Sequence, residues 1–151
     1  PAVLSDHQND LVITISERII PATDTGGAEA AHVNRFIDAM LADGFPEADR
    51  DRFLNGLDAV DEEAQAQHGA AFLECPPEQQ MALLTAWDEA AFGAEADFNP
   101  DEPPFFRTMK ELTIFGYYTS EIGASQELRF DPVMGRYEPC VPFEEIGRTW
   151  A

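Results

Sequence analysis

The sequence predicts an all-α fold, a compact single-domain bundle of about five to six helices that ends in an irregular C-terminal tail. Three observations lead to this fold class. Apolar residues recur at intervals of three and four positions along five segments, which is the spacing of one helix face. Strand-like alternation is nearly absent before residue 128. Finally, 151 residues with 44% hydrophobic side chains suit one domain, residues 1–151, with a core of its own.

The first expected helix lies in the segment SDHQNDLVITISERIIP, residues 5–21. Ser5 and Gln8, three positions apart, match the capping box that starts many helices. Pro21 ends the segment, because proline cannot continue a helix. The apolar side of this helix consists of Leu11, Ile15 and Ile19.

Two helices are expected next, after the turn-rich stretch PATDTGG. The second covers about residues 33–41 and closes at Asp43 and Gly44. The third covers about residues 46–68 and ends before Gly69. Their inward positions are Val33, Phe36, Ile37, Met40 and Leu41 in the second helix, and Phe53, Leu57, Val60 and Ala64 in the third.

Two further helices each open on a pair of prolines, which suit the first turn of a helix. The fourth begins at Pro76 and Pro77. The fifth begins at Pro103 and Pro104, and we expect it to run as far as Gly123. Residues 1–123 then form the helical core and residues 124–151 the irregular tail. Within the tail, the segments LRF (128–130) and GRY (135–137) are compatible with one short hairpin.

The charge of the chain excludes two classes of partner. The formal net charge is -20, with 29 acidic residues against 9 basic ones. Such a chain repels the phosphates of nucleic acid and the surface of an anionic membrane. No apolar run approaches the roughly 20 residues that a spanning helix needs. We therefore expect no nucleic acid partner and no direct membrane insertion.

The residues that carry chemistry in enzymes do not form a recognisable site. The three histidines, His7, His32 and His68, lie on or beside different expected helices and lack the paired spacing of a zinc site. Gly26 and Gly27 do not make a dinucleotide fingerprint, since no strand precedes them. The sequence thus indicates no catalytic, cofactor-binding or metal-binding residues on this chain.

Two longer segments resemble a known family. SERIIPATDTGGAEAAHVNRFIDAML, residues 16–41, resembles the N-terminal signature of the gluconate 2-dehydrogenase subunit 3 family. FRTMKELTIFGYYTSEIG, followed by ELRFDPVMGRYEPC, resembles the C-terminal signature of that family, in which Gly-Tyr-Tyr-Thr-Ser-Glu precedes a proline-containing turn and a cysteine. The order of the two segments suggests that the resemblance extends over nearly the whole chain.

The resemblance implies a small, non-catalytic subunit of an oxidoreductase complex. Its partner in this family is a large catalytic subunit of the glucose-methanol-choline type, which holds FAD and oxidises a sugar or a glycoside. Some complexes add a cytochrome c subunit. The small subunit stabilises and escorts the large one through twin-arginine (Tat) export, so the expected location is the periplasm. It is also expected to shape the substrate entrance.

The resemblance also implies a set of contact residues for the large subunit. Tyrosines are enriched at interfaces, and the tail after the fifth helix looks like an arm laid on a partner. Adjacent helical residues diverge by about 100°, so the two neighbouring tyrosines cannot both face the same way. The expected contacts are Tyr117, Tyr118, Glu121, Arg136, Tyr137, Cys140, Phe143 and Trp150.

The two cysteines allow two pairings under this resemblance. Cys140 matches the cysteine of the family pattern, and we expect it to form a disulfide with the large subunit. Cys75 has a local explanation, because it precedes the fourth helix where relatives carry a capping Ser or Thr. The alternative is a disulfide between Cys75 and Cys140 within the chain; an oxidising compartment permits either.

Two other functions remain open on the sequence alone. One is a stand-alone binding module with an unrelated protein partner. The other is an independent enzyme that uses Tyr117, Ser120 and Glu121. Ser120 has no histidine near it in sequence to activate it, which disfavours the enzyme.

Overall fold

The structure, a computed structural model, describes residues 2–94, 96, 99–133, 135 and 140–151. These residues form six α-helices and no strand, which confirms the predicted all-α class. The helices are α1 Asp6–Ile19, α2 Val33–Ala39, α3 Glu47–His68, α4 Pro77–Phe92, α5 Phe105–Tyr118 and α6 Phe143–Ile146. Three short helical segments of other types are η1 Met40–Gly44, η2 Phe72–Glu74 and η3 Gly123–Glu127. No helix among the described residues is both long and apolar enough to cross a membrane.

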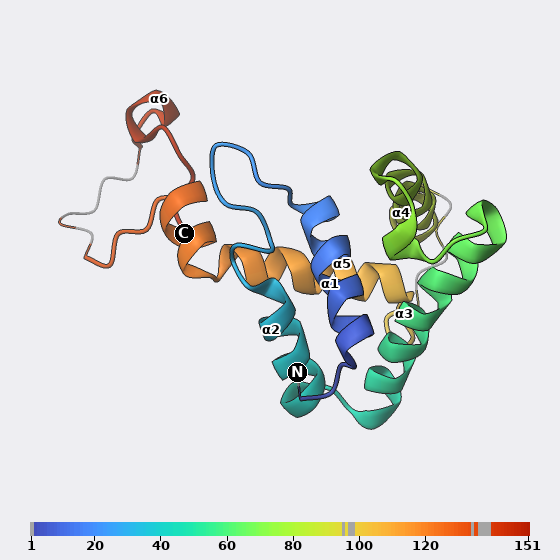
Figure 1. The fold of residues 1–151 in the computed structure, drawn as a ribbon. Coiled ribbons are helices and arrows are strands. Elements are labelled where there is room, and N and C mark those ends of the chain that lie inside the picture. The colour runs from blue at the N-terminus through green and yellow to red at the C-terminus, as the bar shows by residue number, and fades with distance from the viewer. Residues whose placement is uncertain (1, 95, 97–98, 134, 136–139) are drawn as a thin grey trace.

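Helix α5 is the centre of the fold. It packs against α1, α2, α3 and α4, and Figure 1 shows it running through the middle of the molecule. Its inward side joins one core that the other helices complete. The buried residues of α5 are Phe106, Met109, Leu112, Thr113, Gly116 and Tyr117. Contacts with four other helices therefore fix the position of α5 in the protein.

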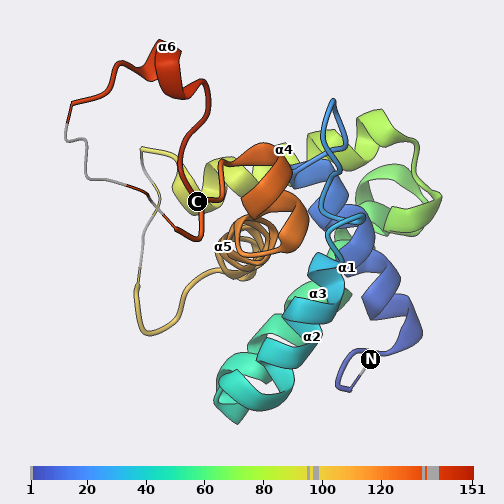
Figure 2. The ribbon, with the colours of Figure 1, turned by 90° about the vertical axis from the view of Figure 1, so that its left-hand side faces the viewer.

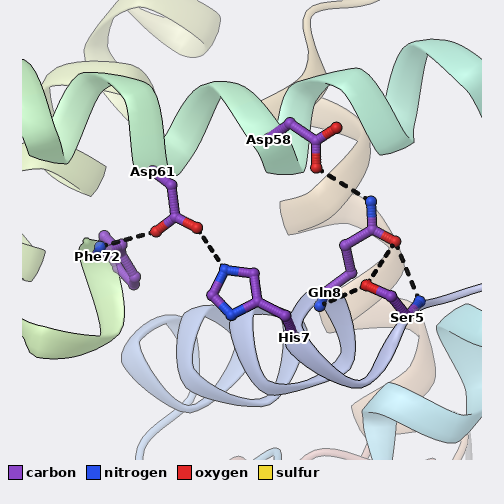
Figure 3. A network of polar contacts seen from close by, with 6 residues as sticks. All are labelled: Ser5, His7, Gln8, Asp58, Asp61 and Phe72. Carbon is purple, nitrogen blue, oxygen red and sulfur yellow. Dashed lines mark hydrogen bonds and ion pairs between the residues drawn. The ribbon is translucent and has the colours of Figure 1, made fainter.

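The start of α1 has the capping box that the sequence predicts, and it is also hydrogen-bonded to α3. The backbone N–H of Gln8 donates to Ser5 Oγ at 3.2 Å, and the backbone N–H of Ser5 donates to Gln8 Oε1 at 3.1 Å, which completes the capping box. The Gln8 amide also donates to the carboxylate of Asp58 on α3 at 3.1 Å (Figure 3). One side chain thus both caps its own helix and joins it to a neighbour.

A buried carboxylate holds the segment that precedes α1. Asp38, on α2, accepts hydrogen bonds from the backbone N–H groups of Leu4 and Val3, each at 3.0 Å, and from that of Ala2. Burial alone would raise the pKa of Asp38, but these three backbone donors outweigh it and hold the pKa below its ordinary value of 3.8. The carboxylate is therefore more acidic in the folded chain than in the unfolded one.

Two expected helices differ from the prediction in their last turns. The second continues past Ala39 as the π-type segment η1. The fifth does not run unbroken to Gly123 but ends at Tyr118. There the hydroxyls of Thr119 and Ser120 donate to the carbonyls of the preceding turn, at 2.7 and 2.6 Å, before the chain re-forms helical turns through η3. Hydroxyl side chains that bond backbone carbonyls in this way compete with regular helix geometry.

The C-terminal tail forms a loop at one end of the bundle. Both Figure 1 and Figure 2 place it beyond the C-terminal end of α5, away from α3. The described part of the hairpin expected around Asp131 contains no strand, and Arg136 and Tyr137 lie outside the described residues. Arg129 instead forms an isolated parallel bridge with Trp150. The tail also contains α6, which the sequence analysis did not predict.

Candidate functional site

The two neighbouring tyrosines of α5 have opposite environments. Tyr117 is only 2% exposed, and its hydroxyl donates to the carbonyl of Gly26 at 2.8 Å. Tyr118 is 39% exposed, and its ring meets that of Tyr117 edge-on at 5.3 Å. Tyr117 is therefore a core residue, and its predicted role as a contact for a partner is corrected, because its side chain has almost no surface. Tyr118 stays available for contact.

The other predicted contacts that the structure describes lie at the surface. Glu121 is exposed at the start of the turns after α5. Phe143, the first residue of α6, is 62% exposed, and Trp150 is 36% exposed. Cys140 is also exposed. Arg136 and Tyr137 lie outside the described residues, so their predicted roles stay predictions.

The outward side of α5 carries a group of apolar side chains that the sequence analysis missed. Ile114, Phe115 and Tyr118 are 40%, 59% and 39% exposed, and they are neighbours at helical spacings of three and four. In Figure 2, α5 is seen nearly end-on, with α1, α2 and α3 on one side and the C-terminal tail with α6 toward the other. A signal was present in the sequence, because residues 112–118 are almost apolar all round, which is typical of a helix covered on every side.

One aromatic ring from α2 extends this group. Phe36 is half-buried, and its ring centroid lies 5.7 Å from that of Phe115. It fits there because Gly116 has no side chain: a Cβ on Gly116 would lie 2.6 Å from Phe36 Cδ1. We name the set Phe36, Ile114, Phe115 and Tyr118 the α5 face.

The last part of the tail, from Arg129 onward, closes on itself. The backbone N–H of Arg129 donates to the carbonyl of Thr149 at 2.8 Å, and that of Ala151 donates to the carbonyl of Arg129 at 3.1 Å. The guanidinium of Arg129 also lies 4.4 Å from the ring centre of Trp150, a cation–π contact. We call the loop held in this way, residues 129–151, the arm.

The arm has no buried residue in its described part. Besides Phe143 and Trp150, it exposes Phe130 at 61% and Val133 at 77%. Its charge also differs from that of the bundle: residues 128–151 carry four acidic and three basic residues, whereas residues 1–127 carry 25 acidic and six basic ones. The arm is thus an apolar, nearly neutral extension of a strongly acidic domain.

The residues of the hypothetical enzyme are used for structure. Ser120 Oγ donates to the carbonyl of Tyr117 at 2.6 Å and accepts from the N–H of Gly123 at 3.0 Å, so the hydroxyl shapes the turn that ends α5. The Tyr117 hydroxyl is bonded to Gly26. This geometry disfavours Ser120 as a nucleophile.

A histidine–aspartate pair on the surface also has a structural role (Figure 3). His7 Nε2 lies 2.5 Å from one carboxylate oxygen of Asp61, and the other oxygen accepts the backbone N–H of Phe72 at 2.8 Å. The Asp61 carboxylate therefore joins α1 and η2 to its own helix, α3. Among the residues that the structure describes, no group of three or more His, Cys, Asp or Glu side chains is placed to hold a metal ion.

The Gly26–Gly27 pair does not fit a phosphate group. The Glu17 carboxylate accepts the backbone N–H groups of Ala22 and Glu29, at 2.8 and 2.9 Å, and so fixes the ends of this loop. A Cβ on Gly27 would lie 2.5 Å from that carboxylate. Because a negative charge already faces the glycine, the loop would repel a phosphate group.

The two cysteines are free thiols in very different surroundings. Cys75 is buried at 5% exposure, and its Sγ lies 3.9 Å from the carbonyl oxygen of Ala70. Cys140 is exposed on the arm. A disulfide between them would require the Cys75 thiol to leave the core or the arm to reach it, whereas a partner can approach Cys140 from solvent.

Comparison with known proteins gives one match. A family model described as gluconate 2-dehydrogenase subunit 3 matches residues 6–135, which runs from α1 into the arm. No curated protein and no solved structure matches the chain. The matched region includes the whole α5 face, whereas Cys140, Phe143 and Trp150 lie beyond it.

Proposed function

Since the chain belongs to the gluconate 2-dehydrogenase subunit 3 family, we propose that it is a non-catalytic accessory subunit that binds and stabilises a large, FAD-dependent sugar or glycoside dehydrogenase subunit. The family description names one subunit of a dehydrogenase, and the proposal therefore assumes that this chain binds another subunit. FAD belongs to the large subunit, and a cytochrome c subunit is the further partner implied by the family.

The observation that carries this proposal is the set of exposed apolar side chains on the outward side of α5 and on the arm. Phe115, Phe130, Val133 and Phe143 are each more than half exposed in a chain with a net charge of -20. Large apolar patches on soluble chains mark protein interfaces, and their burial in a complex would supply the main favourable term in binding. The structural use of Tyr117 and Ser120 supports a non-catalytic role.

Co-expression with the candidate large subunit tests this function. We expect a tag on this chain to recover a stable complex that contains flavin and oxidises sugar with an artificial electron acceptor. The chain purified alone should carry no flavin and show no activity. Sugar oxidation by the chain alone would overturn the non-catalytic role, and recovery of the chain without the flavoprotein would overturn the accessory role.

We further propose that the complex is exported in the folded state by the Tat route and works in the periplasm. Supporting this, an FAD-loaded enzyme must fold before export, and a small helical partner that binds it can supply the signal for both subunits. Expression of the large subunit with and without the signal-bearing precursor of this chain, followed by cell fractionation, provides the test. Equal amounts of periplasmic flavoprotein in both cases would contradict the escort role.

The arm provides the proposed covalent link between the subunits. Cys140 is exposed and therefore accessible to a cysteine of the large subunit in an oxidising compartment. Non-reducing electrophoresis should show one heavy band that separates on reduction, and Cys140→Ser should abolish that band while Cys75→Ser leaves it. Separate subunits in the wild-type complex would overturn the link.

The same surface gives a proposal for the substrate entrance. If the arm lies on the large subunit, its aromatic side chains would border the access path of the substrate. Phe143→Ala in the purified complex is then expected to raise KM with little change in kcat. An unchanged KM for Phe143→Ala and for Trp150→Ala would contradict this role.

A further inference from the structure

We infer that the α5 face is a direct contact for the large subunit and that the opposing surface on that subunit is apolar at its centre and basic at its rim. This inference rests on the proposed function and adds to it the location of the contact and the chemistry of the partner surface.

The last two turns of α5 expose apolar side chains where a surface helix normally carries charges. Ile114, Phe115 and Tyr118 project from the side of α5 opposite to its buried residues. A helix that is apolar on all sides is normally covered on all sides. The described part of the chain covers this side only in part, since Phe115 remains 59% exposed, Ile114 40% and Tyr118 39%.

The aromatic rings of the α5 face are held in place before any partner binds. The Phe36 ring lies in the space left by Gly116 and contacts the Phe115 ring at a centroid separation of 5.7 Å. The Tyr118 ring rests edge-on against the buried Tyr117. Rings that are already fixed lose little conformational freedom on binding, which is typical of the side chains that dominate binding energy.

Charge decides which kind of partner fits. Glu111, whose carboxylate also lies 3.4 Å from Arg107 Nε one turn earlier on α5, and Glu121 are both exposed. They bracket the α5 face along the chain, three positions before Ile114 and three after Tyr118. A second copy of the chain would bring two surfaces of the same sign together, each from a molecule of charge -20, and would be repelled. A different chain would bind favourably if it placed apolar side chains opposite the rings and Lys or Arg opposite the glutamates. Burial of apolar surface and attraction between opposite charges would then both favour binding.

Photo-crosslinking in the intact complex identifies directly which chain contacts the α5 face. A photoreactive amino acid placed at position 115 is expected to cross-link to the large subunit, whereas the same group at position 81 should not. Met81, on α4, is a matched control because it is 43% exposed. Cross-links from position 115 to a second copy of the chain or to its own arm would overturn the inference.

Exchange of subunits measures the strength of the contact. Complexes made with Ile114→Ser/Phe115→Ser are expected to exchange with labelled wild-type chain roughly 30-fold faster than the wild-type complex, because loss of central anchors acts on dissociation. Met81→Ser should exchange at the wild-type rate. Thermal melts of the free variants check that both remain folded.

The two glutamates at the rim, Glu111 and Glu121, are expected to affect the rate of association. Glu111→Gln/Glu121→Gln is expected to slow association about threefold and to weaken its dependence on salt, with little effect on dissociation. Exchange at the wild-type rate by Ile114→Ser/Phe115→Ser, in a complex that forms normally, would overturn this inference and leave the accessory role intact. A wild-type chain that binds no flavoprotein would overturn both.

Discussion

At the scale of single residues, Tyr117 and Tyr118 show how neighbours on one helix divide between core and surface. Tyr117 fills the core and bonds the loop at Gly26, whereas Tyr118 faces solvent beside Phe115. The helical rotation of about 100° per residue requires such a division but does not say which residue faces inward. The position of the bundle on one side of α5 decides it.

Removal of the Tyr117 hydroxyl tests this assignment. Tyr117→Phe is expected to lower the free energy of unfolding by about 1 kcal/mol, because the Gly26 carbonyl loses its hydrogen-bond donor. Tyr118→Phe, at the exposed neighbour, is the control and should change stability by less than about 0.5 kcal/mol. Urea unfolding followed by circular dichroism measures both. Equal effects would contradict the division of the two side chains.

Asp38 gives a prediction about pH. Because its pKa is lower in the folded chain than its ordinary value of 3.8, the charged carboxylate stabilises the fold above that value. The stabilisation is lost as the pH falls through the lower folded pKa. Asp38→Asn is therefore expected to cost roughly 1.5 kcal/mol at pH 7, and this cost should shrink in strongly acidic solution.

Urea titrations at a series of pH values follow the stability difference between wild type and Asp38→Asn. Asp43→Asn is the control, since Asp43 is exposed on η1 near the same helix. Its effect should stay below about 0.5 kcal/mol at every pH. A cost for Asp38→Asn that stays constant down to the lowest pH would show that the charge of Asp38 does not contribute.

At the scale of elements, glycines set how closely the helices approach. Gly116 allows Phe36 of α2 to lie on α5, and Gly56 allows Phe105 to lie on the backbone of α3. A Cβ on Gly56 would be 2.2 Å from Cγ of Phe105, whose ring also meets those of Phe53 and Trp87 edge-on. The start of α5 is thereby fixed between α3 and α4.

Gly56→Ala is expected to destabilise the protein by about 2 kcal/mol, although alanine favours helix formation, because the Phe105 side chain must move out of a packed site. The physical cause can be isolated with a double-mutant cycle. In a Phe105→Gly background, which removes the ring and also the Phe105 Cβ that would lie 2.4 Å from the new methyl group, the same Gly56→Ala change should be neutral or stabilising by up to about 1 kcal/mol. A Gly56→Ala cost that persists in that background would rule out the ring contact as its origin.

At the scale of the whole molecule, charge is unevenly distributed. The bundle carries nearly all of the net charge of -20, and the arm is almost neutral. Mutual repulsion keeps such a chain apart from its copies but also weakens its folded state. The apolar surfaces of the α5 face and the arm are therefore best suited to a chain of different charge.

This distribution predicts that salt stabilises the free protein. Raising NaCl from about 10 to 200 mM should raise Tm, by on the order of 3 °C for each kcal/mol of repulsion that is screened. Differential scanning calorimetry measures the shift, and KCl is the control because screening does not depend on the cation. A fall in Tm with salt would mean that attractive ion pairs outweigh the repulsion.

Much of the fold was accessible from the sequence because its signals are local. The capping pair Ser5 and Gln8, the prolines that open α4 and α5, and the glycine that ends α3 each act within one or two turns. Apolar spacing identified the inward residues of α3 correctly. The departures lie where hydroxyl groups or distant segments intervene, as at Ser120 and at the Arg129–Trp150 bridge.

The sequence by itself determined the all-α class, the order of the helices and the excess of negative charge, because composition, caps and periodicity are properties of the chain alone. The family of this protein also follows from the sequence, through its signature segments. Only the tertiary structure decided that Tyr117 is buried, that Phe36 joins Phe115 and Tyr118 in one exposed patch, and that the arm closes at Arg129. Those facts depend on which segments meet in space, and contacts between residues far apart in the chain leave no local spacing from which they could be predicted.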